Sequence, residues 1–252
     1  GLEAVLFEKT DGASVSNLTI EGTTLTQNTQ KGALSNDIRH SVVTDIRVKD
    51  LAINNDTNQT GGLAGTIADS EIRRISVENI SIRSNNTMGG IAGQFDGKIM
   101  EDCVVSGSIE GTSVHPMGVR AGGITGWQGG GTIRRVVTKV NITAPAPVGN
   151  GGIIGGPQSG SAAVESAVSL STGANANRIS GWDVLGMSSS AYELETSDSH
   201  SSMNDTNADR IFAVTEEQAK EKTFYTETLG WSADVWSFDS LAADGIPALK
   251  KL

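Results

Sequence analysis

The chain has 252 residues, of which 31 are glycine and only 4% are aromatic, and it carries a net charge of −10. This acidity argues against binding of nucleic acid or of an anionic membrane through a basic face. No apolar run approaches the ~20 residues needed to cross a bilayer, and Cys103 is the single cysteine, which excludes an internal disulfide framework.

A glycine-rich pentapeptide recurs along the chain. Its copies begin at Gly61, Gly89, Gly122 and Gly151 and read GGLAG, GGIAG, GGITG and GGIIG. When the second glycine is taken as an anchor, the series extends in both directions at a nearly constant step. The seven anchors are Val5, Ala33, Gly62, Gly90, Gly123, Gly152 and Gly181. Their period of roughly 29 residues is typical of a solenoid in which each repeat forms one turn, here called a rung.

Aligning the chain on these anchors reveals four apolar columns. The first position past the anchor holds Leu6, Leu34, Leu63, Ile91, Ile124 and Ile153, and the tenth holds Val15, Val43, Ile72, Met100 and Ile133. The thirteenth holds Leu18, Ile46, Ile75, Cys103 and Val136, and the fifteenth holds Ile20, Val48, Val77, Val105 and Thr138. The step of two between the last two columns and the β-branched content indicate strands. The sequence therefore predicts an all-β fold, a right-handed parallel β-helix of about seven rungs with these columns inside.

Charged residues occupy the positions between those columns. Arg73, Glu101 and Arg134 stand at the eleventh position past successive anchors, and Asp45, Arg74, Asp102 and Arg135 stand at the twelfth. Because signs alternate from rung to rung, the pattern predicts a solvated ion-pair ladder. Glu101 and Asp102 are also the best candidates for a carboxylate-based polysaccharide lyase or hydrolase, but alternation favours charge neutralisation over catalysis. The repeated glycines are interpreted as corner residues that need positive φ or close backbone approach, not as a phosphate loop.

The repeat decays near residue 200. We therefore divide the chain into a β-helix over 1–200 and a C-terminal capping segment over 201–252, rich in aromatic residues, that covers the rear end of the stack. Within the cap, Thr215 and Gln218 fit a capping box that begins a short helix through about Thr226, with Gly230 at or just after its end. The front end has no such element, so we expect upstream sequence to continue or close the stack.

The Gly-Gly-Ile-Ala-Gly repeats resemble the GLUG repeats of Gram-positive surface proteins. The closing stretch from Leu229-Gly230-Trp231 through Trp236 to Gly245-Ile246-Pro247 is similar to the usual end of such arrays. With the opening Val5-Leu6-Phe7, the whole chain resembles the non-catalytic region before the protease domain of streptococcal-type immunoglobulin A proteases and related zinc metalloproteases. The resemblance implies an extracellular, cell-wall-attached setting on a Gram-positive bacterium.

Catalytic zinc chemistry of that family needs an H-E-x-x-H motif, which this chain lacks. Its three histidines, His40, His115 and His200, are scattered and are interpreted as surface residues without a carboxylate partner at ligand spacing. We therefore expect no catalytic residue and no cofactor in this chain. Zinc would belong to a separate protease domain of the parent protein, as the resemblance implies.

The cap contains one candidate metal site. Asp205, Asn207, Asp209 and Glu216 fall at positions 1, 3, 5 and 12 of a calcium-loop template. Position 6 is Arg210 instead of glycine, which opposes the sharp turn and adds a positive charge. The pattern favours a polar loop leading into the capped helix, with the calcium loop as the weaker alternative.

The rung from Gly90 to Gly123 is four to five residues longer than its neighbours, and such insertions form loops on the outside of a solenoid. The extra residues lie near His115, Pro116, Met117 and Arg120, and Trp127 follows in the next rung. Tryptophan beside methionine and arginine is typical of protein interfaces. These five residues are the candidate binding patch, with a bland surface insertion as the alternative.

The absence of a catalytic motif and the resemblance together predict a non-catalytic spacer or substrate-recognition module of a secreted zinc metalloprotease. The resemblance implies a host glycoprotein such as immunoglobulin A and the other domains of the same chain as partners, and the composition predicts no nucleic acid and no membrane span. The alternatives are a GLUG-type adhesin or carbohydrate-binding rod without a protease and, third, a β-helical polysaccharide enzyme.

Overall fold

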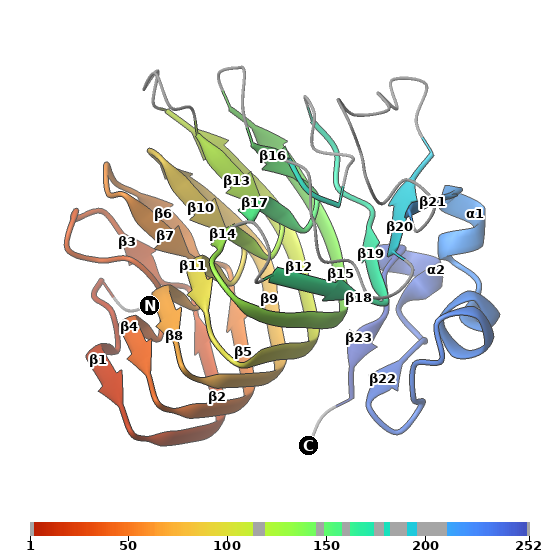
Figure 1. The fold of residues 1–252 in the computed structure, drawn as a ribbon, viewed down its shortest axis with the longest axis horizontal. Coiled ribbons are helices and arrows are strands. Elements are labelled where there is room, and N and C mark those ends of the chain that lie inside the picture. The colour runs from red at the N-terminus through yellow and green to blue at the C-terminus, as the bar shows by residue number, and fades with distance from the viewer. Residues whose placement is uncertain are drawn as a thin grey trace.

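The computed structural model describes residues 3–112, 119–144, 149–157, 162–173, 179–181, 191–195 and 211–250. In these ranges parallel strands stack as a β-solenoid of about five turns, which runs from β1 to β19 in Figure 1. The predicted all-β parallel β-helix is confirmed. No helix among these residues combines the length and the apolar character that a membrane crossing requires.

Three parallel sheets form the walls of the solenoid. The first has six strands in the order β1 (Phe7–Asp11), β4 (Ser35–Arg39), β8 (Ala64–Ala68), β11 (Ala92–Asp96), β14 (Thr125–Gln128) and β17 (Ile154–Pro157). The second has four strands, β7 (Gln59–Gly61), β10 (Thr87–Gly89), β13 (Arg120–Gly122) and β16 (Asn150–Gly151). These two walls meet at the glycine pentapeptides.

The third wall is an eleven-stranded sheet, and it contains the longest strands of the described structure, β9 (Glu71–Ser84), β12 (Ile99–Gly111) and β15 (Gly131–Thr143). Its main order is β2 (Ser14–Glu21), β5 (Val42–Lys49), β9, β12, β15, β19 (Ala167–Ser169), β20 (Ala191–Leu194) and β21 (Ile211–Val214). The remaining members are β3 (Thr24–Leu25), β6 (Ala52–Asn54) and β18 (Ala162–Glu165).

The predicted register agrees with the strand pairing. Six of the seven anchored rungs contribute a strand to the first wall, and the seventh keeps a single isolated bridge between Ile154 and Ser180. The predicted interior columns are buried from the second rung onward. Thr138 is buried among them, where its hydroxyl donates to the Gly152 carbonyl at 2.7 Å. In the first rung, by contrast, Leu6 is 37% exposed and Val15 and Leu18 are only half-buried, because no rung covers them on the front side among the described residues.

The column at the twelfth position past the anchor has a backbone conformation that the sequence did not reveal. Its members, Asn17, Asp45, Arg74, Asp102 and Arg135, all have positive φ, between 48° and 61°. Each rung therefore bends at this column, and the eleventh and twelfth positions both face outward before the chain returns to its inner column at the thirteenth. Stacking of like conformations keeps the strands in register despite the left-handed residue.

The pentapeptide glycines serve close approach and not positive φ. They are not among the residues with positive φ. A Cβ placed on Gly90 would overlap the Gly123 carbonyl of the next rung, and one on Gly126 would overlap the backbone of Met88 in the second wall. Glycine is therefore required here because rungs and walls touch backbone to backbone.

The segment after β21, residues 215–250, is here called the tail. It contains α1 (Glu216–Ala219), the π-helical turn η2 (Phe224–Thr228), β22 (Trp236–Ser237), α2 (Leu241–Asp244) and β23 (Ala248–Leu249). The predicted capping box is confirmed, since the Thr215 hydroxyl accepts from Gln218 N and the Gln218 side chain accepts from Thr215 N. The single predicted helix is wrong in its extent, because α1 ends at Ala219 and a separate π-helical turn follows. Gly230 has φ +68°, as expected for a residue after a helix end.

The tail lies along a side wall of the solenoid, which differs from the predicted cap over the rear end. Its aromatic cluster packs on the outward-facing Val104, Val137 and Val168 of β12, β15 and β19. Among the described residues, five side-chain hydrogen bonds join the two parts: Trp231 to Ser166, Ser166 to the Leu229 carbonyl, Lys139 to the Asp244 carbonyl, Trp236 to Asp102, and Arg74 to the Lys250 carbonyl. The reason is visible in the rungs, where aliphatic residues replace the polar Thr19, Arg47 and Ser76 of the same outward column.

Candidate functional site

Two of the five predicted patch residues, Arg120 and Trp127, lie in the described structure. His115, Pro116 and Met117 fall outside the described residues. Arg120 begins β13 in the second wall, and Trp127 lies in β14 of the first wall. The glycine corner between these strands turns their outward faces toward one another, and the two side chains meet there.

Arg120 and Trp127 form a cation–π pair. The guanidinium carbon of Arg120 lies 4.6 Å from the centroid of the indole ring. Both side chains are half-buried, and desolvation by this burial lowers the pKa of Arg120 from its ordinary value. A guanidinium held flat on an aromatic ring is pre-organised, so it can donate to a carboxylate or carbonyl of a partner with little further loss of side-chain entropy.

Polar side chains continue the same corner toward the front of the solenoid. Gln94 pairs with Trp127 in the ladder of the first wall, and Gln59 and Thr87 precede Arg120 in the second. The Gln59 amide donates to Gln94 Oε1 at 2.6 Å, and the Gln94 amide donates to Asp96 Oδ2 at 2.5 Å. Side chains from the two walls thus contact one another along several rungs, and the Arg120 and Trp127 pair is the aromatic member of this row.

The second predicted cluster, here called the flank ladder, comprises Arg73, Glu101, Arg134, Asp102 and Arg135. Glu101 lies between Arg73 and Arg134 in the strand register, as alternation predicts. It forms ion pairs with Arg73, with Arg134 Nε at 2.6 Å and with Arg135 Nη2 at 2.5 Å. Arg135 Nε also binds Asp102 Oδ1 at 2.7 Å, and this hydrogen bond raises the pKa of Arg135.

The expectation that this ladder is solvated is wrong for its carboxylates. Glu101 is 3% exposed and is surrounded by Arg73, Arg134 and Arg135. Asp102 is 7% exposed beneath the tail, where the indole Nε1 of Trp236 donates to Asp102 Oδ1 at 3.3 Å. Both oxygens of each carboxylate are engaged by arginine side chains. A catalytic acid or base needs access to substrate, and these buried carboxylates do not offer it.

The weak calcium-loop candidate has little structural description. Asp205, Asn207 and Asp209 lie outside the described residues, whereas Glu216 is exposed in the first turn of α1. Within the part of the chain that the structure describes, no three His, Cys, Asp or Glu side chains group as metal ligands.

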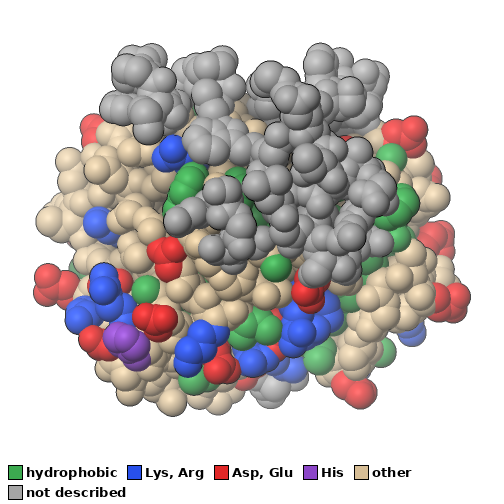
Figure 2. Space-filling view, in the orientation of Figure 1, with side chains coloured by type: hydrophobic (Ala, Val, Ile, Leu, Met, Phe, Trp, Pro, Cys, Tyr) green, Lys and Arg blue, Asp and Glu red, His purple; other side chains and the backbone are tan. Residues whose placement is uncertain are grey.

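His40 has carboxylate neighbours that the sequence analysis did not find. Its Nδ1 lies 2.9 Å from Asp11 Oδ1, and its Nε2 lies 3.7 Å from Asp69 Oδ2. Together with Lys9, which pairs with Asp11 at 2.8 Å, these residues form what we call the corner ladder. The pKa of Asp11 is lowered to about 2, first by the hydrogen bond to Lys9 and then by that to His40. The register from Asp11 to His40, one rung apart, was the available signal. Figure 2 shows charged side chains of both signs along this lower edge, with a histidine among them.

Cys103 is a core residue, as its column predicts. It is fully buried, and desolvation strongly raises the pKa of its thiol. The thiol is therefore held in the unreactive protonated form.

Comparison with protein-family models, with curated proteins and with solved structures yields no match to this chain.

Proposed function

We propose that this chain is a non-catalytic β-solenoid module that holds and helps to recognise a host glycoprotein, such as immunoglobulin A, for a secreted zinc metalloprotease attached to the cell wall. The parent enzyme and its setting come from the resemblance of the glycine repeats and of the closing tryptophan segment. Recognition, rather than spacing alone, is supported by the Arg120 and Trp127 pair.

That pair carries the proposal because of its chemistry. Tryptophan and arginine are among the residues most enriched at the positions that dominate interface energies. Here they are stacked at 4.6 Å and positioned by two strands rather than by a mobile loop. The row of Gln59, Gln94 and Asp96 beside them provides donors and acceptors of the kind that surround an interface anchor.

The test is capture of immunoglobulin A by the chain and by its Trp127→Ala variant. We expect the variant to bind at least about 30-fold more weakly, as for removal of an interface anchor. Phe7→Ala is the matched control, because Phe7 is an exposed aromatic residue of the same wall, four rungs away, at the front of the solenoid. Unchanged capture by Trp127→Ala in a protein with the parental circular dichroism spectrum would remove the recognition surface from the proposal.

The adhesin alternative differs in the rest of the reading frame. A downstream H-E-x-x-H supports the protease, whereas a complete reading frame without one favours a GLUG-type adhesin or carbohydrate-binding rod. A polysaccharide enzyme would instead release new fragments from a glycan panel and lose that turnover in Glu101→Gln.

A further inference from the structure

The tail carries a pocket that is separate from the Arg120 and Trp127 pair. It has a volume of about 370 Å³ and is lined by residues from α1 to β23. The lining residues are Lys220, Lys222, Ala233, Trp236, Ser237, Phe238, Asp239, Leu241, Ala242 and Lys250. This volume lies at the lower end of the range for small-ligand sites.

Lysines at this pocket stand out in a chain of net charge −10. Most arginines of the solenoid have carboxylate partners, from Arg39 and Arg47 to the flank ladder. In the described structure, by contrast, none of Lys220, Lys222 and Lys250 lies within ion-pair distance of a carboxylate. Lys222 and Lys250 therefore line one cavity with no carboxylate of the described residues at ion-pair distance, which favours an external anion.

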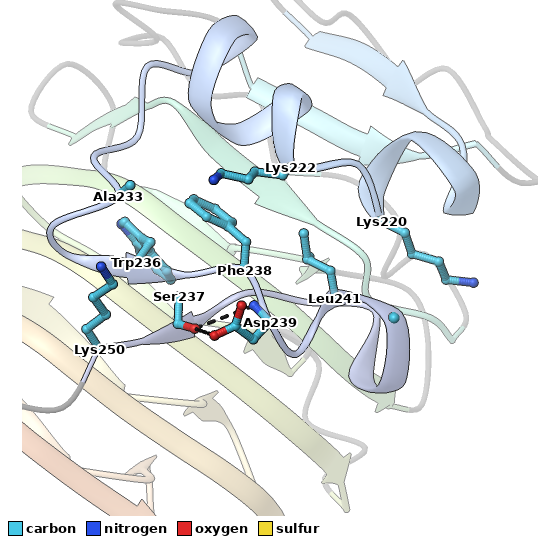
Figure 3. Close-up of a pocket in the computed structure, with 10 residues that line it drawn as sticks. Lys220, Lys222, Ala233, Trp236, Ser237, Phe238, Asp239, Leu241 and Lys250 are labelled. Carbon is cyan, nitrogen blue, oxygen red and sulfur yellow. Dashed lines mark hydrogen bonds between the residues drawn. The ribbon is translucent and has the colours of Figure 1, made fainter.

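The aromatic side chains of the pocket restrict the chemical class of the ligand further. Figure 3 shows Lys222 beside the Phe238 ring and Lys250 beside Trp236, while Lys220 extends away from both. The Lys222 ammonium lies 6.0 Å from the centroid of Phe238. Trp236 and Leu241 are buried beneath the pocket, so the half-buried Phe238 ring provides the apolar surface that a ligand carrying C–H groups can cover.

The carboxylate of Asp239 favours an anion that carries hydroxyl groups over an anion without them. Its carboxylate lines the pocket and accepts from the Ser237 hydroxyl at 3.1 Å. A carboxylate can only accept hydrogen bonds, so it repels a bare anion but binds hydroxyl donors. A ligand that satisfies these groups therefore carries an anionic group, at least one hydroxyl and an apolar face.

We propose that this tail pocket binds an acidic sugar, with its carboxylate between Lys222 and Lys250, its ring against Phe238 and a hydroxyl donating to Asp239. The site goes beyond the proposed recognition surface at Trp127 and does not depend on it, since it lies on the tail.

The experiment is an NMR titration of the chain with glucuronic acid and, in parallel, with glucose and acetate. We expect glucuronic acid to shift the ring resonances of Phe238 saturably, and glucose and acetate to bind at least tenfold more weakly. If glucose binds as tightly as glucuronic acid, the lysines do not recognise the carboxylate. If acetate binds as tightly as glucuronic acid, the pocket does not recognise the sugar ring.

Variants locate the site. Lys222→Gln combined with Lys250→Gln should weaken glucuronic acid binding about tenfold or more, as for loss of charged hydrogen bonds. Lys98→Gln is the single-charge control, because Lys98 is an exposed lysine of the solenoid that does not line this pocket. Binding retained by the double variant, or weakened equally by Lys98→Gln, would overturn the proposal. Trp127→Ala should leave this binding unchanged, which separates the site from the proposed function.

Discussion

The flank ladder and the corner ladder both place opposite charges on neighbouring rungs, but only in the flank ladder does the tail contact a carboxylate, where Trp236 donates to Asp102. Asp102 is 7% exposed, whereas in the corner ladder the side chain of His40 is 62% exposed. The stacking rule alone thus produces an ion pair in either place. Whether that pair contributes to stability depends on a segment more than a hundred residues away, because water screens the exposed pairs and is excluded from the buried ones.

The same contrast holds for apolar residues on the outer faces. Val137 faces outward from β15 and is fully buried by the tail, whereas Val42 faces outward from β5 and is 41% exposed. The apolar cluster between the tail and the side wall is a second hydrophobic core. An outward valine is therefore part of this second core in one rung and part of the surface in another.

The largest expected effect tests this second core. Val137→Lys places a charge against the tryptophans and Tyr225 of the tail, so we expect a loss of about 3–5 kcal/mol in the free energy of unfolding, measured with urea. Val42→Lys is the matched control and should change stability by less than about 0.5 kcal/mol. Equal effects of the two substitutions would show that the tail does not protect the side wall in solution.

A smaller effect is expected within the flank ladder. Glu101→Gln leaves three arginines without their shared carboxylate, and because those arginines are 29–37% exposed we expect a loss of about 2 kcal/mol rather than the full cost of a buried ion. Glu110→Gln removes the exposed partner of Arg83 and should cost less than about 1 kcal/mol. The comparison fails if urea unfolding finds Glu110→Gln as damaging as Glu101→Gln.

The smallest effect concerns acid titration of the corner ladder. The pKa of Asp11 is lowered to about 2, below its ordinary value of 3.8, so its contribution to stability is present above about pH 4 and is lost as the pH falls toward 2. In NMR titrations of the carboxyl group, Lys9→Met should raise this midpoint more than His40→Ala, because Lys9 is the larger cause. A titration midpoint of Asp11 near pH 3.8 in the parental protein would show that Lys9 and His40 do not stabilise its carboxylate in solution.

Much of the candidate site follows from residue types and spacing. The period of the pentapeptides places Leu63, Ile91 and Ile124 in one buried column and puts Glu101 between Arg73 and Arg134. The insertion before Arg120 directs attention to the neighbouring Trp127. The stacking of the two side chains was not predictable, because it depends on the angle between two walls that meet at the glycine pair of the pentapeptide.

The features that sequence reasoning missed arise where segments remote in the chain come together. The tail pocket needs Lys222 and Lys250 on one surface, and Asp102 becomes buried only through Trp236, which is 134 residues away. The positive φ of Arg74 and Arg135 was hidden for a different reason, since such residues are not the usual ones in that conformation and only the stack imposes it.

The amino-acid sequence alone therefore determined the rung length, the inner columns and the order of charges, because a periodic fold repeats its local requirements in every turn. Only the tertiary structure decided which outer face the tail covers, which ion pairs are shielded from water and where the tail forms a pocket. Those outcomes depend on how a non-repeating segment packs on a repeating one. The outward Val104, Val137 and Val168 make one face suitable for that contact, but the rung period does not specify which segment covers it.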